Sequence, residues 1–247
     1  MKRIILLISV FSIILLSGCN NQSIIVKNHI DENGYSIVDN GLLPKRIKYK
    51  ESSNMILPMF SGLENFEKNF YNENYIHIII KGEKISSQSY YKDNGYVINN
   101  DSKTQDLRAY TISEIKINDI LNQDKDINFK SGDIIKIYEP YYYKPIDNEK
   151  SEFVIPASLA HIAVLKQNEK YILYLQINKT EEKTIGINVG FEKLENIWYN
   201  YYAFNIDKIT INLKSKEEAK EKLNNNEKYY GIYPHLYPEV FDKYNIK

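Results

Sequence analysis

The stretch Tyr171-Ile172-Leu173-Tyr174-Leu175-Gln176-Ile177 decides the fold class of this chain. Successive side chains of an extended strand point to opposite faces of a sheet, so every second residue lies on the same face. On one face this stretch places only large apolar side chains, which are Tyr171, Leu173, Leu175 and Ile177. The alternation predicts a β-strand with at least one face in a hydrophobic core.

Segments with β-rich or alternating patterns recur on both sides of this strand. They are Tyr75–Ile80, Tyr90–Ile98, Asp106–Ile117, Asp133–Tyr138, Ile185–Val189, Trp198–Ile206 and Ile209–Leu213. Asp93-Asn94-Gly95 lies inside the second of them and predicts a tight hairpin turn. Because strands follow one another at intervals of roughly 10–20 residues with few helices between them, we predict one mostly-β domain, a barrel or sandwich, over residues 61–214.

Helical patterns in the chain are short. Ser61-Gly62-Leu63-Glu64 has the spacing of a capping box and predicts a helix that begins at Ser61. Pro156–Lys166 is a second candidate for a helix, and Ser215-Lys216-Glu217-Glu218 has capping-box spacing again. We therefore assign residues 215–247 to a C-terminal helix and an extended tail, which from Tyr229 is an extended or a short helical segment with Pro234 and Pro238.

Composition and charge exclude several classes of protein. The chain carries 32 basic and 32 acidic side chains among 247 residues, so it lacks the positive charge of a dedicated nucleic-acid binder. Hydrophobic residues make up 43% of it, which is enough for a core and argues against a disordered chain. A single Cys excludes an internal disulfide framework and a multi-Cys zinc or iron–sulfur site.

The N-terminus has the features of an export signal. Met1-Lys2-Arg3 is followed by an apolar run from Ile4 to Leu16, which is shorter than the roughly 20 residues that a membrane helix needs. Leu16-Ser17-Gly18-Cys19 resembles the lipobox of bacterial lipoproteins. The resemblance implies transfer of a diacylglyceryl group to the Cys19 thiol, cleavage between Gly18 and Cys19, and often an acyl chain such as palmitate on the new amino group. An ordinary signal peptide or a signal anchor is the alternative.

This signal sets the expected organisation of the chain. Residues 1–18 form the signal peptide, 19–34 a tether, and 35–60 an irregular segment before the β domain. The signal peptide takes Lys2 and Arg3 with it, so the exported part is slightly acidic, and we expect lipid rather than charge to hold it at the membrane. The abundance of Ile, Asn, Lys and Tyr suggests a host with AT-rich DNA, and together with the resemblance to a lipobox it fits a Gram-positive bacterium of low GC content. We predict a location at the extracytoplasmic face of the cell membrane.

Part of the β domain resembles a known shape. Tyr75–Ile85, Thr111–Leu121, Phe129–Ile137 and Asn168–Leu175 follow one another as in small exported proteins of Gram-positive bacteria with an OB-like barrel, related in shape to the netrin and metalloproteinase-inhibitor module. The resemblance covers residues 62–206 and implies an OB-like β-barrel. Inhibitors of that shape use a free N-terminal Cys on the protease zinc. Because Cys19 is expected to carry lipid, that inhibitory mechanism does not transfer.

Two groups of aromatic residues are candidates for ligand binding. The candidates are Tyr141, Tyr142, Tyr143, Trp198, Tyr199 and Tyr201. The first group lies between Pro140 and Pro145 and predicts a constrained loop, and the second lies on one strand. Neighbouring strand residues point to opposite faces, so about half of these rings are expected outside the core, where Tyr and Trp bind sugars, peptides and proteins well. The alternative is that a chain with 22 Tyr uses them at half-buried sheet positions.

Residue types that usually carry catalysis or bind metals form no recognisable pattern. The four His, which are His29, His77, His161 and His235, are not spaced as paired metal ligands. Ser158 lacks the flanking glycines of a nucleophile elbow, and adjacent carboxylates such as Glu181-Glu182 and Glu217-Glu218 do not face each other. Residues 122–133 resemble a calcium loop, but Ile127 replaces its Gly and Asp133 its Glu. We predict no catalytic residues, no metal and no cofactor.

These observations lead to three hypotheses of function. The first is a membrane-anchored lipoprotein whose β domain is a binding module for a protein, peptide or glycan of the envelope. The second is an accessory or immunity subunit of an envelope complex. The third, with the least support in the sequence, is an enzyme that acts on the cell wall.

Overall fold

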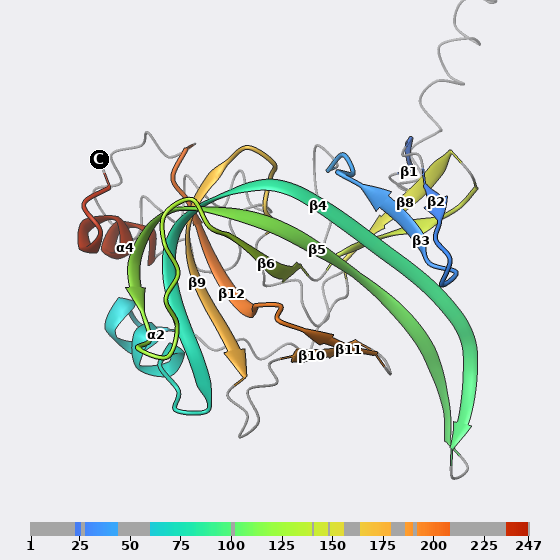
Figure 1. The fold of residues 1–247 in the computed structure, drawn as a ribbon, viewed down its shortest axis with the longest axis horizontal. Coiled ribbons are helices and arrows are strands. Elements are labelled where there is room, and N and C mark those ends of the chain that lie inside the picture. Colours follow the sequence, from blue (N-terminus) through green and yellow to red (C-terminus); the bar gives the residue numbers. More distant parts are fainter. Residues whose placement is uncertain are drawn as a thin grey trace, which may run out of the picture.

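The described part of the chain is mostly β-structure (Figure 1). The computed structural model describes residues 23–25, 28–43, 60–99, 102–139, 141–147, 149–155, 164–178, 186–189, 192–207 and 236–246. In these ranges a seven-stranded sheet is accompanied by a three-stranded sheet and by the pair β10 (Gly186–Val189) and β11 (Glu192–Glu195). None of the helices in these ranges is long and apolar enough to span a membrane. The predicted mostly-β class is confirmed.

Strand β9 (Lys170–Asn178) contains the stretch that predicted the class. It pairs antiparallel with β4 (Tyr75–Asn99) on one side and with β12 (Tyr199–Asn205) on the other. Its four alternating apolar residues lie together in one buried cluster, as predicted. Ile172 and Tyr174, on the opposite face, are buried in a second cluster. Both faces of β9 are therefore covered, which explains why the stretch has almost no polar residue.

Strands β4 and β5 (Ser102–Gln123) form one long curved hairpin to which the other strands add (Figure 1). The first third of β4 pairs with β9, and its middle pairs with β3 (Ser36–Asp39), which pairs in turn with β2 (His29–Ile30). β6 (Ile134–Glu139) pairs with the middle of β5. Four shifts of register interrupt the hairpin, and such irregularities increase twist and bending.

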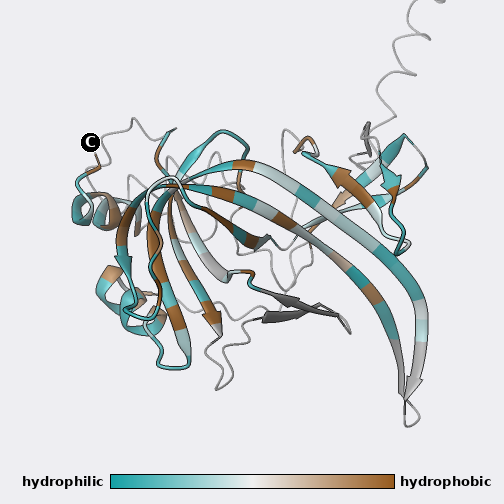
Figure 2. Ribbon diagram, viewed as in Figure 1, coloured by the Kyte–Doolittle hydropathy of each residue, from teal (hydrophilic) through white to brown (hydrophobic). Residues whose placement is uncertain are grey.

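The described strands curl around a core but do not close into a barrel. β6, at one edge of the sheet, meets the residue before β12 through a single parallel bridge between Ile137 and Trp198. The Tyr138 amide donates to Trp198 O at 2.8 Å, and the Trp198 amide donates to Lys136 O at 2.9 Å. Figure 2 shows hydrophobic residues concentrated where these strands come together, whereas the far part of the hairpin is largely hydrophilic.

Two helices, α2 (Leu63–Phe70) and α4 (Tyr237–Lys243), cover the outer face of β9 and β12. α2 begins after Gly62, and no side chain caps it in the way that the predicted capping box requires. The cap comes from α4, because the Leu63 amide donates to Glu239 Oε2 at 2.7 Å. The predicted capping box is therefore wrong. The tail from Tyr229, predicted to be extended or a short helix, contains the helix α4.

Asp93-Asn94-Gly95 forms a bulge inside β4 rather than the predicted turn. The register of β4 against β5 shifts here, so that Asn94 and Gly95 together stand opposite Asp106. Gly95 has a φ of +80°, a conformation that glycine adopts without a steric penalty and that this kind of bulge requires. The two strands continue to Asn99 before the chain reverses.

The segment predicted as a tether, residues 19–34, contains strands. β1 (Ser23–Ile25) pairs with β8 (Lys150–Val154), and β8 pairs with β7 (Tyr142–Pro145). β2 lies in the same segment, and β3 lies in the segment from 35 to 60 that the sequence predicts to be irregular. The three-stranded and the seven-stranded sheet therefore both include residues that lie N-terminal to the predicted domain boundary at residue 61.

Several predicted features lie outside the described residues. They are the signal peptide with Cys19, most of the helix over 156–166, the strand over 209–213 and the helix that begins at Ser215.

Candidate functional site

The first aromatic group that the sequence suggested, Tyr141–Tyr143, is not an exposed loop. The Tyr141 and Tyr143 side chains are 1% and 2% exposed, and both rings pack against Phe153 of β8. Tyr142 is half-buried, and its ring centroid lies 5.9 Å from that of Tyr91. The predicted binding surface therefore loses Tyr141 and Tyr143, because β7 lies between β8 and β4 and directs these rings into the core.

The second aromatic group is also buried where it is described. Trp198 and Tyr199 are 4% and 7% exposed and belong to the cluster inside the curled sheet. Tyr201 lies in β12, and its side chain falls outside the described residues. The Trp198 ring centroid lies 6.0 Å from that of Phe129, and the ring packs in the core rather than offering a surface.

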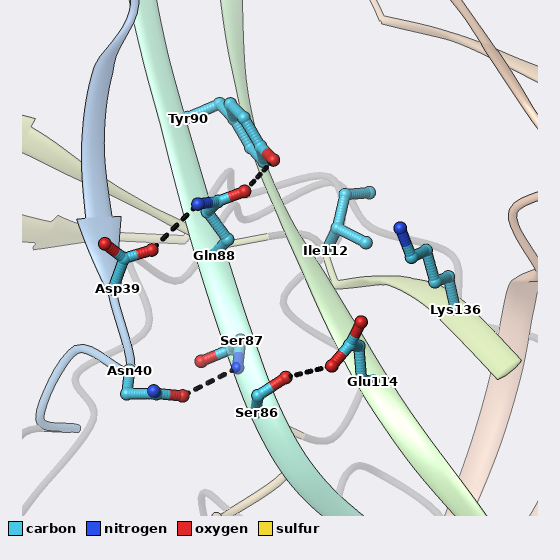
Figure 3. A pocket seen from close by; sticks show the side chains of 9 residues that line it. All are labelled: Asp39, Asn40, Ser86, Ser87, Gln88, Tyr90, Ile112, Glu114 and Lys136. Atoms are coloured by element: carbon cyan, nitrogen blue, oxygen red, sulfur yellow. Dashed lines mark hydrogen bonds between the residues drawn. The ribbon is translucent and has the colours of Figure 1, made fainter. Parts of the chain in front are cut away.

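A polar cleft lies on the face of the large sheet across β3, β4, β5 and β6 (Figure 3). Its volume is about 220 Å³. The lining residues are Asp39, Asn40, Ser86, Ser87, Gln88, Tyr90, Ile112, Glu114 and Lys136. The sequence patterns singled out none of these residues for binding.

A bulge in β4 directs side chains into this cleft. The register against β5 shifts between Lys84 and Ser86, so that Ile85 is the extra residue. One extra residue reverses the face to which the following side chains point. Lys84, which precedes the bulge, lies in the core, whereas Ser86, Gln88 and Tyr90, which follow it, line the cleft.

On the core side of the bulge, Lys84 and Glu139 form a buried ion pair with 2.6 Å between Nζ and Oε1. Lys84 Nζ also donates to Tyr141 OH at 3.0 Å and to Leu165 O at 2.9 Å, so each of its three hydrogens has an acceptor. Glu139 accepts hydrogen bonds from Ser113 Oγ and from the Leu165 amide. The network thus joins β4, β5, β6 and the segment before β9.

The electrostatics of this network favour a structural role. Burial lowers the pKa of Lys84, while the negative charge of Glu139 opposes that shift. Burial, followed by the nearby Glu139, raises the pKa of Tyr141 well above its ordinary value, so its phenol stays protonated. Removing one partner of such a pair typically costs about 3–5 kcal/mol. We interpret the network as a clamp that holds the bulge and, through it, one wall of the cleft.

Two charged groups of the cleft, Glu114 and Lys136, lie in a row with Ser86 across the sheet. Ser86, Glu114 and Lys136 are direct neighbours in the register of β4, β5 and β6. Ser86 Oγ donates to Glu114 Oε2 at 2.7 Å. Lys136 is exposed, and its ammonium has no hydrogen bond or ion pair to any described residue. An ammonium and a carboxylate with unused bonding capacity therefore lie side by side.

The opposite wall of the cleft is held by its own hydrogen bonds. Gln88 Nε2 donates to Asp39 Oδ1 at 2.8 Å, and Tyr90 OH donates to Gln88 Oε1. Asn40 Oδ1 accepts from the Ser87 amide at 2.9 Å. These contacts fix the positions of polar groups that a ligand would meet, which lowers the entropy cost of binding.

His77 and Asp124 form a pair of the kind that orients a general base in many enzymes. The distance between His77 Nδ1 and Asp124 Oδ2 is 3.4 Å. The other ring nitrogen, Nε2, accepts from the Asn72 amide at 3.2 Å. Because Nε2 is the atom that would take a proton from a substrate, and it is already occupied, we interpret this pair as structural.

The acidic residues of the segment that resembles a calcium loop already cap backbone amides. Asp124 accepts from the His77 amide at 2.9 Å, and Asp133 accepts from the Lys130 amide at 2.8 Å. Within the described ranges, no group of three or more His, Cys, Asp or Glu side chains lies together as a set of metal ligands. His161, His235, Ser158 and the adjacent carboxylates at 181–182 and 217–218 fall outside those ranges.

Comparison with other proteins gives no relative for this chain. No model of a protein family matches it, no curated protein matches it, and no solved structure matches it. Function must therefore be argued from the sequence and from the geometry of the cleft.

Proposed function

We propose that this chain is an exported, lipid-anchored protein whose β domain binds an envelope partner at the extracytoplasmic face of the cell membrane. The anchor is supported by Leu16-Ser17-Gly18-Cys19 after a basic start and an apolar run. Each buried methylene of a lipid chain contributes about 0.8 kcal/mol, so two chains suffice for stable anchoring.

The cleft on β3–β6 is the observation that carries the binding proposal. Its volume of about 220 Å³ is smaller than the roughly 300–1,000 Å³ of most sites that enclose a small molecule. It therefore suits one sugar unit or one side chain of a larger partner better than a whole free ligand. A wall glycan with peptide branches, or an exposed segment of a protein, has this form.

The chemistry of the cleft favours a partner with both an acidic and a neutral polar group. Lys136 offers a cation to a carboxylate or phosphate, and Glu114 offers acceptors to hydroxyl, amide or ammonium groups. Ile112 and the ring of Tyr90 supply the apolar contact area beside these groups. The cleft thereby replaces the buried Tyr141, Tyr143, Trp198 and Tyr199 as the proposed binding surface.

We also propose that the curled sheet is an open OB-like barrel. Support comes from the strand order β12-β9-β4-β5-β6 and from the parallel contact between β6 and Trp198, next to β12. In this assignment β5 and β6 are the second and third strands, whose outer face binds oligosaccharides and oligonucleotides in OB-folds. The cleft lies across this face, and the balanced charge of the chain favours the former class of ligand.

The experiment is a titration of the full-length lipidated protein in detergent with a soluble digest of the producing organism's cell wall. Lys136→Ala should weaken binding about tenfold or more, because a hydrogen bond to a charged group contributes about 1.5–3 kcal/mol. Lys116→Ala is the matched control, since Lys116 is an exposed lysine two residues from Glu114 on the same face of β5 but outside the cleft. Equal losses for the two variants, or binding unaffected by either, would contradict the proposal.

An accessory subunit of an envelope complex is a second candidate, favoured by the far part of the hairpin. Beyond Tyr91 on β4 and before Thr111 on β5, the two strands pair only with each other among the described strands. A two-stranded ribbon has little stability alone, and its open edges accept an added strand of another protein. Both properties favour a protein partner along this ribbon.

Shortening the ribbon tests this second candidate. Because Tyr96 pairs with Gln105, residues 97–104 can be replaced by Asn-Gly, which makes a two-residue hairpin turn. If the chain is an accessory subunit, the shortened protein retains its fold but no longer co-purifies with a membrane complex from intact cells. If the shortened protein still co-purifies with the complex, the ribbon does not bind the partner, and this result would contradict the second candidate.

A further inference from the structure

The chain between Cys19 and the first strand is short. Only residues 20–22 separate Cys19 from Ser23, where β1 begins. An extended chain spans at most about 3.6 Å per residue, so the Cα atoms of Cys19 and Ser23 lie within about 14 Å of each other. β1 is held in a sheet, with Ser23 opposite Glu152 and Ile25 opposite Lys150.

We propose that the lobe formed by β1, β7 and β8, with the neighbouring β2 and residues 40–43, lies directly on the lipid bilayer. This inference rests on the proposed lipidation of Cys19. Lipid chains on Cys19 place that residue at the headgroup layer, which is roughly 5–7 Å thick in each leaflet. Because Ser23 lies within about 14 Å of Cys19, the start of β1 stays close to that layer, and the lobe cannot be separated from the bilayer by the width of a domain. The anchor thus docks this lobe instead of suspending the domain on a tether.

Exposed aliphatic side chains are concentrated on this lobe. Of the four large aliphatic side chains that are exposed in the described ranges, three lie here: Ile30, Leu42 and Ile146, which are 75%, 69% and 56% exposed. The fourth, Ile134, lies on β6. Ile146 follows β7, and the Asn28 side chain donates to Asp147 O at 3.3 Å, which brings the start of β2 beside the turn between β7 and β8. Tyr143 OH donates to Leu42 O at 3.0 Å and ties that loop to β7. Apolar side chains at a headgroup layer gain free energy by partial burial.

Charge does not supply this attachment. The β7–β8 hairpin, residues 142–154, contains two Lys and three acidic residues, so it has no cationic excess to attract anionic lipid. The lobe lies at the end of the molecule opposite α2 and α4 (Figure 1). Lipid docking through the lobe therefore directs the helices away from the bilayer.

The test uses the full-length protein, lipidated in a bacterial host and reconstituted into vesicles of phosphatidylcholine and phosphatidylglycerol. Cys19 is the only Cys of the chain, so Ile146→Cys adds one free thiol for an environment-sensitive fluorophore. Tyr96→Cys is the matched control. Tyr96 is 60% exposed and lies in the far part of the hairpin, where β4 and β5 no longer pair with β3 and β6. Lipids with a quencher in the upper acyl chain should reduce emission at position 146 and leave position 96 unchanged.

The outcomes separate this inference from the proposed anchor. Vesicles that carry the protein but leave both fluorophores unquenched would overturn the docked lobe and keep the anchor. Protein that fails to float with vesicles would overturn both. A flexible Gly-Ser linker of about twelve residues inserted after Gln22, which spans roughly 20 Å on average, should keep flotation and abolish quenching at position 146. Quenching that persists in this variant would show contact that the short chain does not impose, contrary to the inference.

Discussion

At the scale of single residues, the core contains charges whose partners the sequence does not reveal. Lys84 continues the inward alternation of Ile76, Ile78 and Ile80, so its face follows from the pattern. Its partner Glu139 lies 55 positions further along the chain. The partnership depends on the registers of β4, β5 and β6, and bulges set those registers. The alternation of side chains along one strand predicts the face of the sheet on which a residue lies. It does not predict which residue of another strand that side chain meets.

The clamp under the cleft should behave as a coupled pair. Lys84→Met leaves the Glu139 carboxylate buried without its cation and should reduce the free energy of unfolding by about 3–5 kcal/mol. The double variant Lys84→Met, Glu139→Leu removes both charges and should cost less than the sum of the single variants. Urea unfolding measures all three. Lys116→Met, at an exposed site on β5, should stay within about 0.5 kcal/mol. Additive losses would show that the pair is not coupled.

Tyr138 makes stability depend on alkaline pH. Burial raises the pKa of Tyr138 to about 12, whereas an exposed tyrosine has a pKa of about 10. Below pH 10 the phenol is neutral in both states. Between pH 10 and 12 the unfolded chain releases its proton first, so stability falls as pH rises. Between pH 8 and pH 11, the free energy of unfolding should fall by about 1.4 kcal/mol less in the Tyr138→Phe variant than in the wild-type protein. Urea unfolding at pH 8 and pH 11 measures this difference. An equal decrease in the free energy of unfolding for the two proteins would contradict the burial of this phenol.

At the scale of elements, the sequence predicted strands well and their ends poorly. The stretch 171–177 and the segment 133–138 form strands because side-chain alternation is a local property. Asp93-Asn94-Gly95 is ambiguous, since a glycine with positive φ suits a hairpin turn and a bulge equally. The segment forms a bulge because the flanking residues Asp93 and Tyr96 pair with Leu107 and Gln105 of β5. This pairing involves residues more than eight positions away and cannot be inferred from the three residues alone. The cap of α2 likewise comes from a residue 176 positions away.

This cap gives a direct comparison of the two interpretations. Glu239→Ala removes the acceptor of the Leu63 amide and should reduce the free energy of unfolding by about 1 kcal/mol. Glu64→Ala removes the residue that the capping-box pattern singled out; Glu64 is exposed, so its loss should stay within about 0.5 kcal/mol. Urea unfolding of both variants distinguishes them. A larger loss for Glu64→Ala would restore the local capping box.

At the scale of the whole molecule, the curled sheet brings together groups that the sequence keeps far apart. Asp39, Gln88, Glu114 and Lys136 come from four strands and meet only because the bulge, the clamp and the long hairpin set their registers. Conspicuous aromatic runs drew the sequence-based prediction, yet four of the six rings, those of Tyr141, Tyr143, Trp198 and Tyr199, are buried in the core. The residues proposed to bind are ordinary polar and charged side chains on different strands, and no local signal distinguishes them from a solvated face. The proposed lipid anchor, in contrast, was readable because a processing signal is a local motif.

The most direct test of the account places a photoreactive amino acid at Asn40, on the rim of the cleft, in intact cells of the producing organism. Lys68, an exposed residue on α2, is the control position. Binding through the cleft predicts a cross-linked species of higher mass from position 40, none from position 68, and loss of that species when Lys136→Ala is added. No species from position 40, or one that also forms at position 68 and survives Lys136→Ala, would contradict binding through the cleft.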